Sequence, residues 1–268
     1  MVKKYRKTDD LGQHLFTITV FEDAVSIDRA ISVPGSQFKV DADYQRKPTQ
    51  AEFYCLSVGR SLASLLSICQ QLEHSIFYFS SFTPSEKMRK AGISRQSHLL
   101  YCIENYIIRT RSMYDRVLRL VDKVFLVYNP SRLISHELVI SNIHFKNSDI
   151  LSRLKSIRNP VKDFIRERNE IIHERKYLED DLRELEGYTI FLSIDEAPKN
   201  GKNFKFLINN LVSQIVKGKT KLFTEVNKKV FTEIAGLFDE CIGKYQEQLQ
   251  ILEAIHGKVE RYEDSRVR

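Results

Sequence analysis

Residues 49–79 read TQAEFYCLSVGRSLASLLSICQQLEHSIFYF, and this stretch decides the fold. Its apolar side chains recur at the three- and four-residue spacing of one helical face, as at Leu62 and Leu65. Thr49 is followed three residues later by Glu52, which is the pattern of a capping box at the N-terminus of a helix. The stretch therefore predicts a long helix that buries one face.

The same helical spacing recurs over most of the chain. The expected helices cover residues 49–79, 94–127, 133–140, 149–185 and 221–259. Asn129-Pro130 predicts the end of the second helix, Pro160 a kink or restart inside the fourth, and Gly187 the end of that helix. The predicted fold class is mainly α, an up-and-down helical bundle.

The N-terminal segment has a different pattern. Residues 15–21 are rich in β-branched side chains and alternate with Thr, and residues 30–33 are followed by the turn signal Pro34-Gly35 and by 38–40. We expect two or three short strands here, forming a small β-sheet or hairpin, and a further strand-like run at 188–192.

The predicted domain organisation has three parts. A β-rich extension covers residues 1–48, a helical bundle covers 49–262, and a polar tail covers 263–268.

Composition excludes several classes of protein. Hydrophobic residues make up 42% of the 268 residues and charged residues 29%, which is ordinary globular usage and excludes global disorder. The net charge of +7 permits a polyanionic partner without requiring one. Four cysteines without a CxxC pair favour buried thiols in a reducing compartment. With no apolar run of about 18 residues, we expect a cytoplasmic protein with no membrane partner.

The segment at 164–175 carries the strongest functional signal, because it combines Arg168, Asn169 and His173 on one predicted helix. Asn169 lies about 40° around the helix from His173 and Arg166 within about 20°, so these three form a polar stripe. Arg168 lies about 140° away, among apolar residues. A buried guanidinium there needs a carboxylate partner, an interface or a ligand anion.

The sequence Arg168-Asn169-x-x-x-His173 resembles the Arg-x4–6-His motif of the HEPN superfamily, including the polar residue that often follows the arginine. The order of the predicted helices over roughly residues 50–260 is similar to a HEPN bundle, with the motif on a late helix. The spacing of Arg166 also fits the motif, so Arg168 is preferred on the resemblance and Arg166 competes on helical geometry. The β-rich segment is not part of a minimal HEPN domain.

The resemblance implies a metal-independent endoribonuclease that works as a homodimer, with both motifs lining one cleft. The RNA 2′-OH would attack the adjacent phosphate, leaving a 2′,3′-cyclic phosphate and a 5′-OH end. The resemblance implies that His173 acts as the general acid or base. Arg168 would stabilise the charge that develops on the phosphoryl oxygens, and Asn169 would position the phosphate or the imidazole. The implied context is either defence against phage or a toxin–antitoxin system. An antitoxin or regulatory protein would then be a further partner.

Other residues receive supporting or alternative roles. Asp115 on the preceding helix is the expected partner that orients Arg168, and Tyr177 or Glu170 could instead satisfy His173. Arg109 and Arg111 begin a run of arginines that could contact RNA phosphates, although a solvated helix face is the preferred interpretation. No metal-ligand spacing and no nucleotide-loop motif is present, so we expect no metal and no cofactor.

Three hypotheses follow. The first is the HEPN endoribonuclease. The second is a non-catalytic HEPN-fold dimer that binds RNA or protein, in which His173→Ala leaves binding unchanged. The third is a helical interaction protein in which Arg168 is paired inside a monomer core and the motif is a coincidence.

Overall fold

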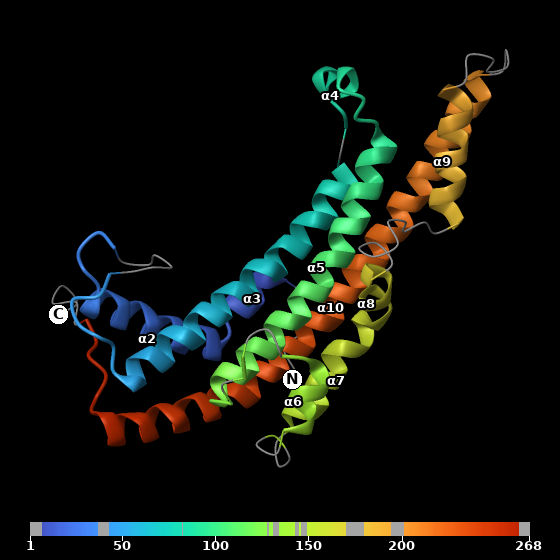
Figure 1. Cartoon of the computed structure of the whole chain (residues 1–268). Helices are drawn as coiled ribbons and strands as arrows, with labels where there is room; N and C mark the ends of the chain where they lie inside the picture. Colours follow the sequence, from blue (N-terminus) through green and yellow to red (C-terminus); the bar gives the residue numbers. More distant parts are fainter. Residues whose placement is uncertain are drawn as a thin grey trace. The chain divides into compact units, whose positions relative to one another are not determined.

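The computed structural model describes residues 7–36, 43–81, 83–127, 129–130, 134–142, 145, 149–169, 180–193 and 201–262. Regular structure within these residues is helical, as Figure 1 shows. The main helices are α1 (Thr8–Gly12), α2 (Leu15–Ile31), α3 (Gln50–Ser81), α4 (Glu86–Lys90), α5 (Arg95–Val124), α6 (His136–Ser141), α7 (Ile150–Arg158), α8 (Lys162–Asn169), α9 (Asp180–Ser193) and α10 (Gly201–His256). The expectation of a mainly helical protein is confirmed.

The chain divides into two compact units, and the long helices α3, α5 and α10 contribute residues to both. The first unit combines residues 1–69, 113–159 and 230–268. The second unit combines residues 70–112 and 160–229.

The predicted β extension is wrong, because the stretch from Leu15 to Ile31 is the single helix α2. Its buried residues include Phe16, Val20 and Ile27, which fall on one helical face. β-branched side chains destabilise a helix by only a few tenths of a kcal/mol each. The free energy gained by burying them is larger than this cost. Around this segment the described residues hold no strand, only an isolated bridge between Ser32 and Tyr44.

The start of α2 and the turn that follows it are set locally. The His14 side chain caps the helix by accepting the N–H of Phe16 at 3.2 Å. The predicted turn at Pro34-Gly35 is present, and Gly35 has a φ of +87°, which favours glycine. Residues 38–40, expected as a strand, lie outside the described part of the chain.

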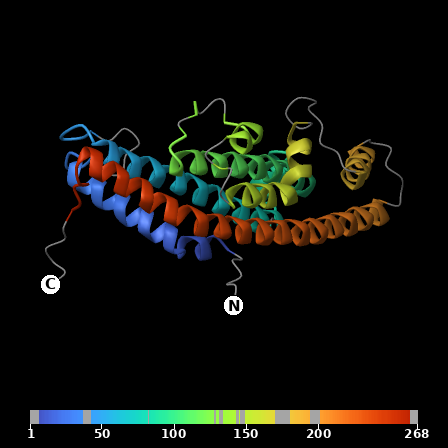
Figure 2. The ribbon, with the colours of Figure 1, turned by 90° about the horizontal axis from the view of Figure 1, so that it is seen from below.

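Aromatic residues of α2, α3 and α10 form the core of the first unit, where these helices run side by side (Figures 1 and 2). The Tyr54 and Tyr245 rings stack with centroids 5.5 Å apart, and Phe16 contacts Phe238 at 5.2 Å. The Tyr245 hydroxyl lies 3.0 Å from a carboxylate oxygen of Asp23, to which it donates. These contacts join residues about 200 positions apart in the chain, so the N-terminal helix belongs to the core of this unit.

A buried carboxylate joins three segments at the start of α3. Glu52 is fully buried, and both its oxygens lie 2.7 Å from guanidinium nitrogens of Arg46. It also accepts the N–H of Thr49 at 2.8 Å and of Glu260 at 3.2 Å, and its own N–H donates to the Thr49 hydroxyl, so the predicted capping box is confirmed. Burial by itself raises the pKa of Glu52, but the hydrogen bonds from Arg46 and the backbone outweigh it and lower the pKa to about 2.

Of three features predicted further along the chain, one is confirmed and two are wrong. The restart expected at Pro160 is confirmed, since α7 ends at Arg158 and a 3-10 turn, Asn159–Val161, leads into α8. The strand-like run at 188–192 and the helix end at Gly187 are wrong, because both lie inside α9.

The last helix also begins earlier than expected, at Gly201. Ile208, Val212 and Ile215 are buried at helical spacing, and the same face continues through Phe223. Burial on both sides of Gly218 carries the helix through the basic run at 217–221, where an interior glycine costs only about 1 kcal/mol. The helix ends at His256, before Gly257 with its φ of +89°.

Gly59 should tolerate no added methyl group, because α2 and α3 approach closely there. A Cβ at Gly59 would lie 2.7 Å from the Cβ of Ala24, which is too close without a backbone shift. We expect Gly59→Ala to lower the free energy of unfolding by about 1–3 kcal/mol. Gly243→Ala is the matched control: its Cβ meets open space in α10, and the change should stabilise by about 0.5–1 kcal/mol. Equal effects in urea denaturation would contradict this close approach.

Glu52 should make stability depend on acid. Its folded pKa of about 2 lies below the ordinary 4.5, so its contribution is present above about pH 4.5 and is lost as the pH falls towards 2. We expect Glu52→Gln to cost about 2 kcal/mol at pH 7, since water screens the partly exposed Arg46. The difference from wild type should shrink between pH 5 and pH 3 in urea titrations followed by circular dichroism. A gap that stays constant over this range would contradict the assignment.

Candidate functional site

The motif helix α8 begins directly after the 3-10 turn at Pro160 and has the sequence KDFIRERN. Its acidic residue Asp163 lies in the first turn, and Arg166 and Arg168 lie in the last turn. Asp163, Arg166 and Arg168 lie at the helix ends whose dipole they complement, whereas Lys162 and Glu167 lie at the opposite ends. The last turn presents two guanidinium groups.

Phe164 holds α8 against the rest of the second unit. Its buried ring meets Tyr106 of α5 at 5.8 Å and Phe223 of α10 at 6.0 Å, both nearly edge-on. Tyr106 and Phe223 stack on each other at 3.8 Å, and Phe79 of α3 lies 6.1 Å from Phe223. Edge-to-face and stacked rings at these distances add to the free energy of burial. Residues of α3, α5, α8 and α10 thus share one aromatic cluster, formed by Phe79, Tyr106, Phe164 and Phe223.

The cluster includes a buried phenol. The Tyr106 hydroxyl lies 2.8 Å from Oδ1 of Asn227, to which it donates, and 3.2 Å from the carbonyl oxygen of Phe223. Burial raises the pKa of Tyr106, so the phenol stays neutral over the physiological range. Its role in this cluster is to orient α5 on α10.

Arg168 lies one turn after Phe164 and is half-buried. A four-residue step turns the helix by about 40°, so Arg168 follows the face on which Val161 and Phe164 are buried. The expectation that this arginine sits among apolar residues stays a prediction. Asp115, its expected partner, is half-buried on α5 in the first unit, and the pairing of the two stays a prediction.

Arg166 occupies a different environment. Its side chain is 73% exposed and lies 3.8 Å from a carboxylate oxygen of Asp163, three residues earlier. An exposed ion pair of this kind contributes little to stability. Arg166 is therefore a solvated cation near the motif.

The remaining motif residues are not placed by the described structure. Asn169 is the last residue of α8, and its side chain is not described. His173 and Tyr177, like Glu170, lie outside the described residues. Their assigned roles stay predictions.

The arginine run on α5 does not form one solvated face. Arg109 is half-buried, and its guanidinium donates to side-chain oxygens of Asn105 and Gln71. Arg116 donates to the carbonyl oxygen of Ser64 at 2.9 Å, whereas Arg119 is exposed. Arg111 is half-buried.

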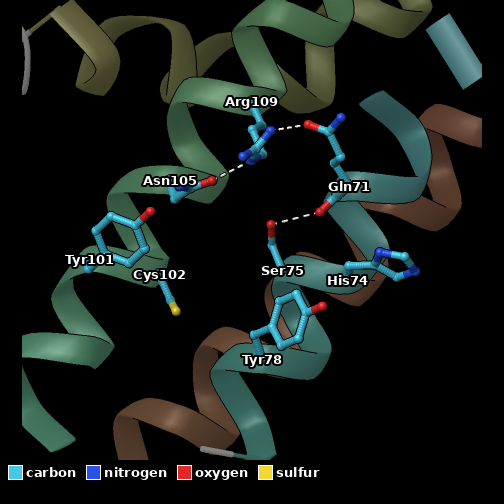
Figure 3. Close-up of a pocket in the computed structure, with 8 residues that line it drawn as sticks. All are labelled: Gln71, His74, Ser75, Tyr78, Tyr101, Cys102, Asn105 and Arg109. Atoms are coloured by element: carbon cyan, nitrogen blue, oxygen red, sulfur yellow. Dashed lines mark hydrogen bonds between the residues drawn. The ribbon is translucent and has the colours of Figure 1, made fainter. Parts of the chain in front are cut away.

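Arg109 lines a cavity of about 230 Å³ in the second unit that the sequence analysis missed. Figure 3 shows the cavity between α3 and α5. Its lining residues are Gln71, His74, Ser75, Tyr78, Tyr101, Cys102, Asn105 and Arg109. The signal in the sequence is the four-residue spacing of Tyr101, Asn105 and Arg109, but only the pairing of two helices reveals the cavity.

No group of three or more His, Cys, Asp or Glu residues among the described residues is arranged to hold a metal ion. No helix in the described part of the chain is long and apolar enough to cross a membrane.

Comparison with known proteins gives one match. A family model described as HEPN_Cthe2314-like HEPN matches residues 56–234, about two thirds of the 268-residue chain. The matched region includes α5 and α8, most of α3 and the first part of α10. No curated protein and no solved structure matches.

Phe164 should be the residue that keeps α8 in place. We expect Phe164→Ala to lower the free energy of unfolding by about 3–5 kcal/mol, since it removes a buried ring and leaves a cavity. Arg166→Ala, two residues later on an exposed position, should change it by less than about 0.5 kcal/mol. Urea denaturation of the two variants measures the difference, and a small effect of Phe164→Ala would show that α8 is held by other contacts.

Proposed function

The chain belongs to the Cthe2314-like HEPN family, and from this we propose that it is a metal-independent endoribonuclease. The observation that carries the proposal is the position of the motif. Arg168-Asn169-x-x-x-His173 begins in the last turn of α8, inside the region that the family model matches. The aromatic cluster anchors that helix one turn before the motif arginine.

The residue types fit cleavage that uses the RNA itself as the nucleophile. His173 accepts the proton of the 2′-OH as its oxygen attacks the adjacent phosphorus, or donates a proton to the departing 5′-oxygen. The bond between phosphorus and the 5′-oxygen breaks, which leaves a 2′,3′-cyclic phosphate and a 5′-OH. This reaction needs no metal ion and no cofactor.

Arg168 and Asn169 are proposed to stabilise the phosphate. A guanidinium donates paired hydrogen bonds to phosphoryl oxygens and offsets the charge that grows on them during attack. Half-burial of Arg168 strengthens such an interaction relative to a fully solvated cation. Arg166, which is solvated, is the alternative motif arginine, and Asp115 is the proposed orienting carboxylate.

The proposed assembly is a homodimer. A two-fold interface places the same helix face of each subunit opposite itself, so two copies of the motif would line one cleft and bind a single RNA strand. A cytoplasmic toxin regulated by an antitoxin, or a phage-defence nuclease, is the proposed setting. A dimer that binds RNA without cutting it is the outcome that would favour the scaffold hypothesis.

RNA cleavage in the presence of EDTA tests this proposal. We expect wild-type protein to cut single-stranded or structured RNA, and His173→Ala to slow cleavage by about 100-fold or more, because it removes the acid and base. Arg168→Gln should slow cleavage similarly, while Arg166→Gln should retain most of the activity.

Thermal unfolding of each variant is the control that separates lost chemistry from lost folding. A well-folded His173→Ala variant that cuts at the wild-type rate, or wild-type cleavage that needs a divalent cation, would contradict the proposal. If Arg166→Gln is inactive and Arg168→Gln active, the motif arginine is Arg166.

A further inference from the structure

The cavity between α3 and α5 holds a cation, Arg109, that pairs with no carboxylate among the residues that the structure describes. Arg109 donates from Nε to Oδ1 of Asn105 and from Nη1 to Oε1 of Gln71. Both acceptors are neutral amides, so they orient the guanidinium without cancelling its charge. Within the described part of the chain, Nη2 of Arg109 makes no hydrogen bond.

The remaining lining residues add no negative charge. None of the eight is Asp or Glu. Burial raises the pKa of the Cys102 thiol, which therefore stays protonated. The cavity carries a fixed positive charge at one end, and an anion with free oxygens would complete the donor fork of Arg109.

Two exposed tyrosines stand further along the same cavity. Tyr78 is 58% exposed and Tyr101 is 62% exposed, although each ring could bury a large apolar area. Figure 3 shows Tyr78 at the end of the cavity away from Arg109, and Tyr101 is eight residues from Arg109 along α5. That separation is about 12 Å along the helix axis.

We propose that this cavity binds one nucleotide unit, with its phosphate on Arg109 and its base against the ring of Tyr101 or Tyr78. A ligand with an anion at one end and a flat ring at the other uses both features, whereas a simple carboxylate would leave the tyrosines unused. Stacking on aromatic rings together with a cationic contact is a general way to bind unpaired nucleotides. The cavity is smaller than sites for drug-sized ligands, about 300–1,000 Å³, and suits a single unit better than a duplex.

The nucleotide can come from a free mononucleotide or from an unpaired residue of an RNA strand. Only the second source rests on the proposed RNA substrate, and neither requires cleavage by His173. The two sources are separated by using AMP and a single-stranded oligonucleotide with 2′-O-methyl groups. This oligonucleotide has no free 2′-OH to act as the nucleophile, so it cannot be cleaved by the proposed reaction. Inorganic phosphate is the third probe, since it has the anion without the base.

Two variants remove the two halves of the site. Arg109→Gln keeps an amide where the guanidinium was, and Tyr101→Ala removes an exposed ring that the core does not need. Arg119→Gln is the charge-matched control, an exposed arginine on the same helix outside the cavity. Fluorescence anisotropy measures oligonucleotide affinity, calorimetry measures AMP and phosphate, and thermal unfolding checks the fold.

We expect Arg109→Gln to weaken binding by about tenfold or more and Tyr101→Ala by about fivefold or more, with about twofold or less for Arg119→Gln. Binding of AMP with these effects assigns a free nucleotide as ligand, and binding of the oligonucleotide alone assigns an RNA strand. The proposal is overturned if both folded cavity variants bind both probes as wild type does. It is also overturned if inorganic phosphate binds as tightly as AMP.

The outcome is distinguishable from that of the proposed function. Protein that binds through Arg109 but does not cut RNA contradicts the nuclease and supports the cavity. Protein that cuts RNA through His173, with binding unaffected by Arg109→Gln, contradicts the cavity alone.

Discussion

Edge-to-face packing of Phe164 on Tyr106 and Phe223 is the contact on which the placement of the motif helix depends. The described residues of α8, Lys162–Asn169, are held against the rest of the second unit by tertiary contacts. The ring of Phe164 supplies such a contact in the middle of the helix. Because a helix repeats every 3.6 residues, fixing Phe164 also fixes the direction in which Arg168 leaves the helix one turn later. The proposed chemistry therefore depends on an apolar residue that takes no part in it.

Sequence periodicity predicted the long helices well where one face is strongly apolar. The capping box at Thr49 and the restart at Pro160 follow from local chemistry, and both are present. The N-terminal helix was misassigned because β-branched residues suggested strands, whereas burial of Phe16 and Val20 against distant parts of the chain decides the matter. Local propensity cannot reveal a partner that lies more than 200 residues away. The early start of α10 was missed because Gly218 and the lysines beside it interrupt the apolar pattern in the sequence. The buried face of the helix nevertheless continues on both sides of Gly218.

The candidate site divides along similar lines. The motif at 168–173 could be found in the sequence because its residues lie within six positions of one another. The cavity at Arg109 could not, because its two walls come from segments about 30 residues apart that a loop and a short helix separate. The four-residue spacing of Tyr101, Asn105 and Arg109 places them on one face of α5, but the sequence does not show that Gln71 lies opposite. The neutral partners of Arg109 are what turn an ordinary surface arginine into a candidate anion site.

The central claim is that the motif that begins on α8 cleaves RNA by promoting attack of the RNA's own 2′-OH on the adjacent phosphate. The chemistry at the ends of the fragments tests this most directly, because only that attack leaves a cyclic phosphate. Mass spectrometry of fragments formed in EDTA should show 2′,3′-cyclic phosphate and 5′-OH ends. Fragments with 5′-phosphate and 3′-OH ends would contradict the mechanism, because they require water as the nucleophile.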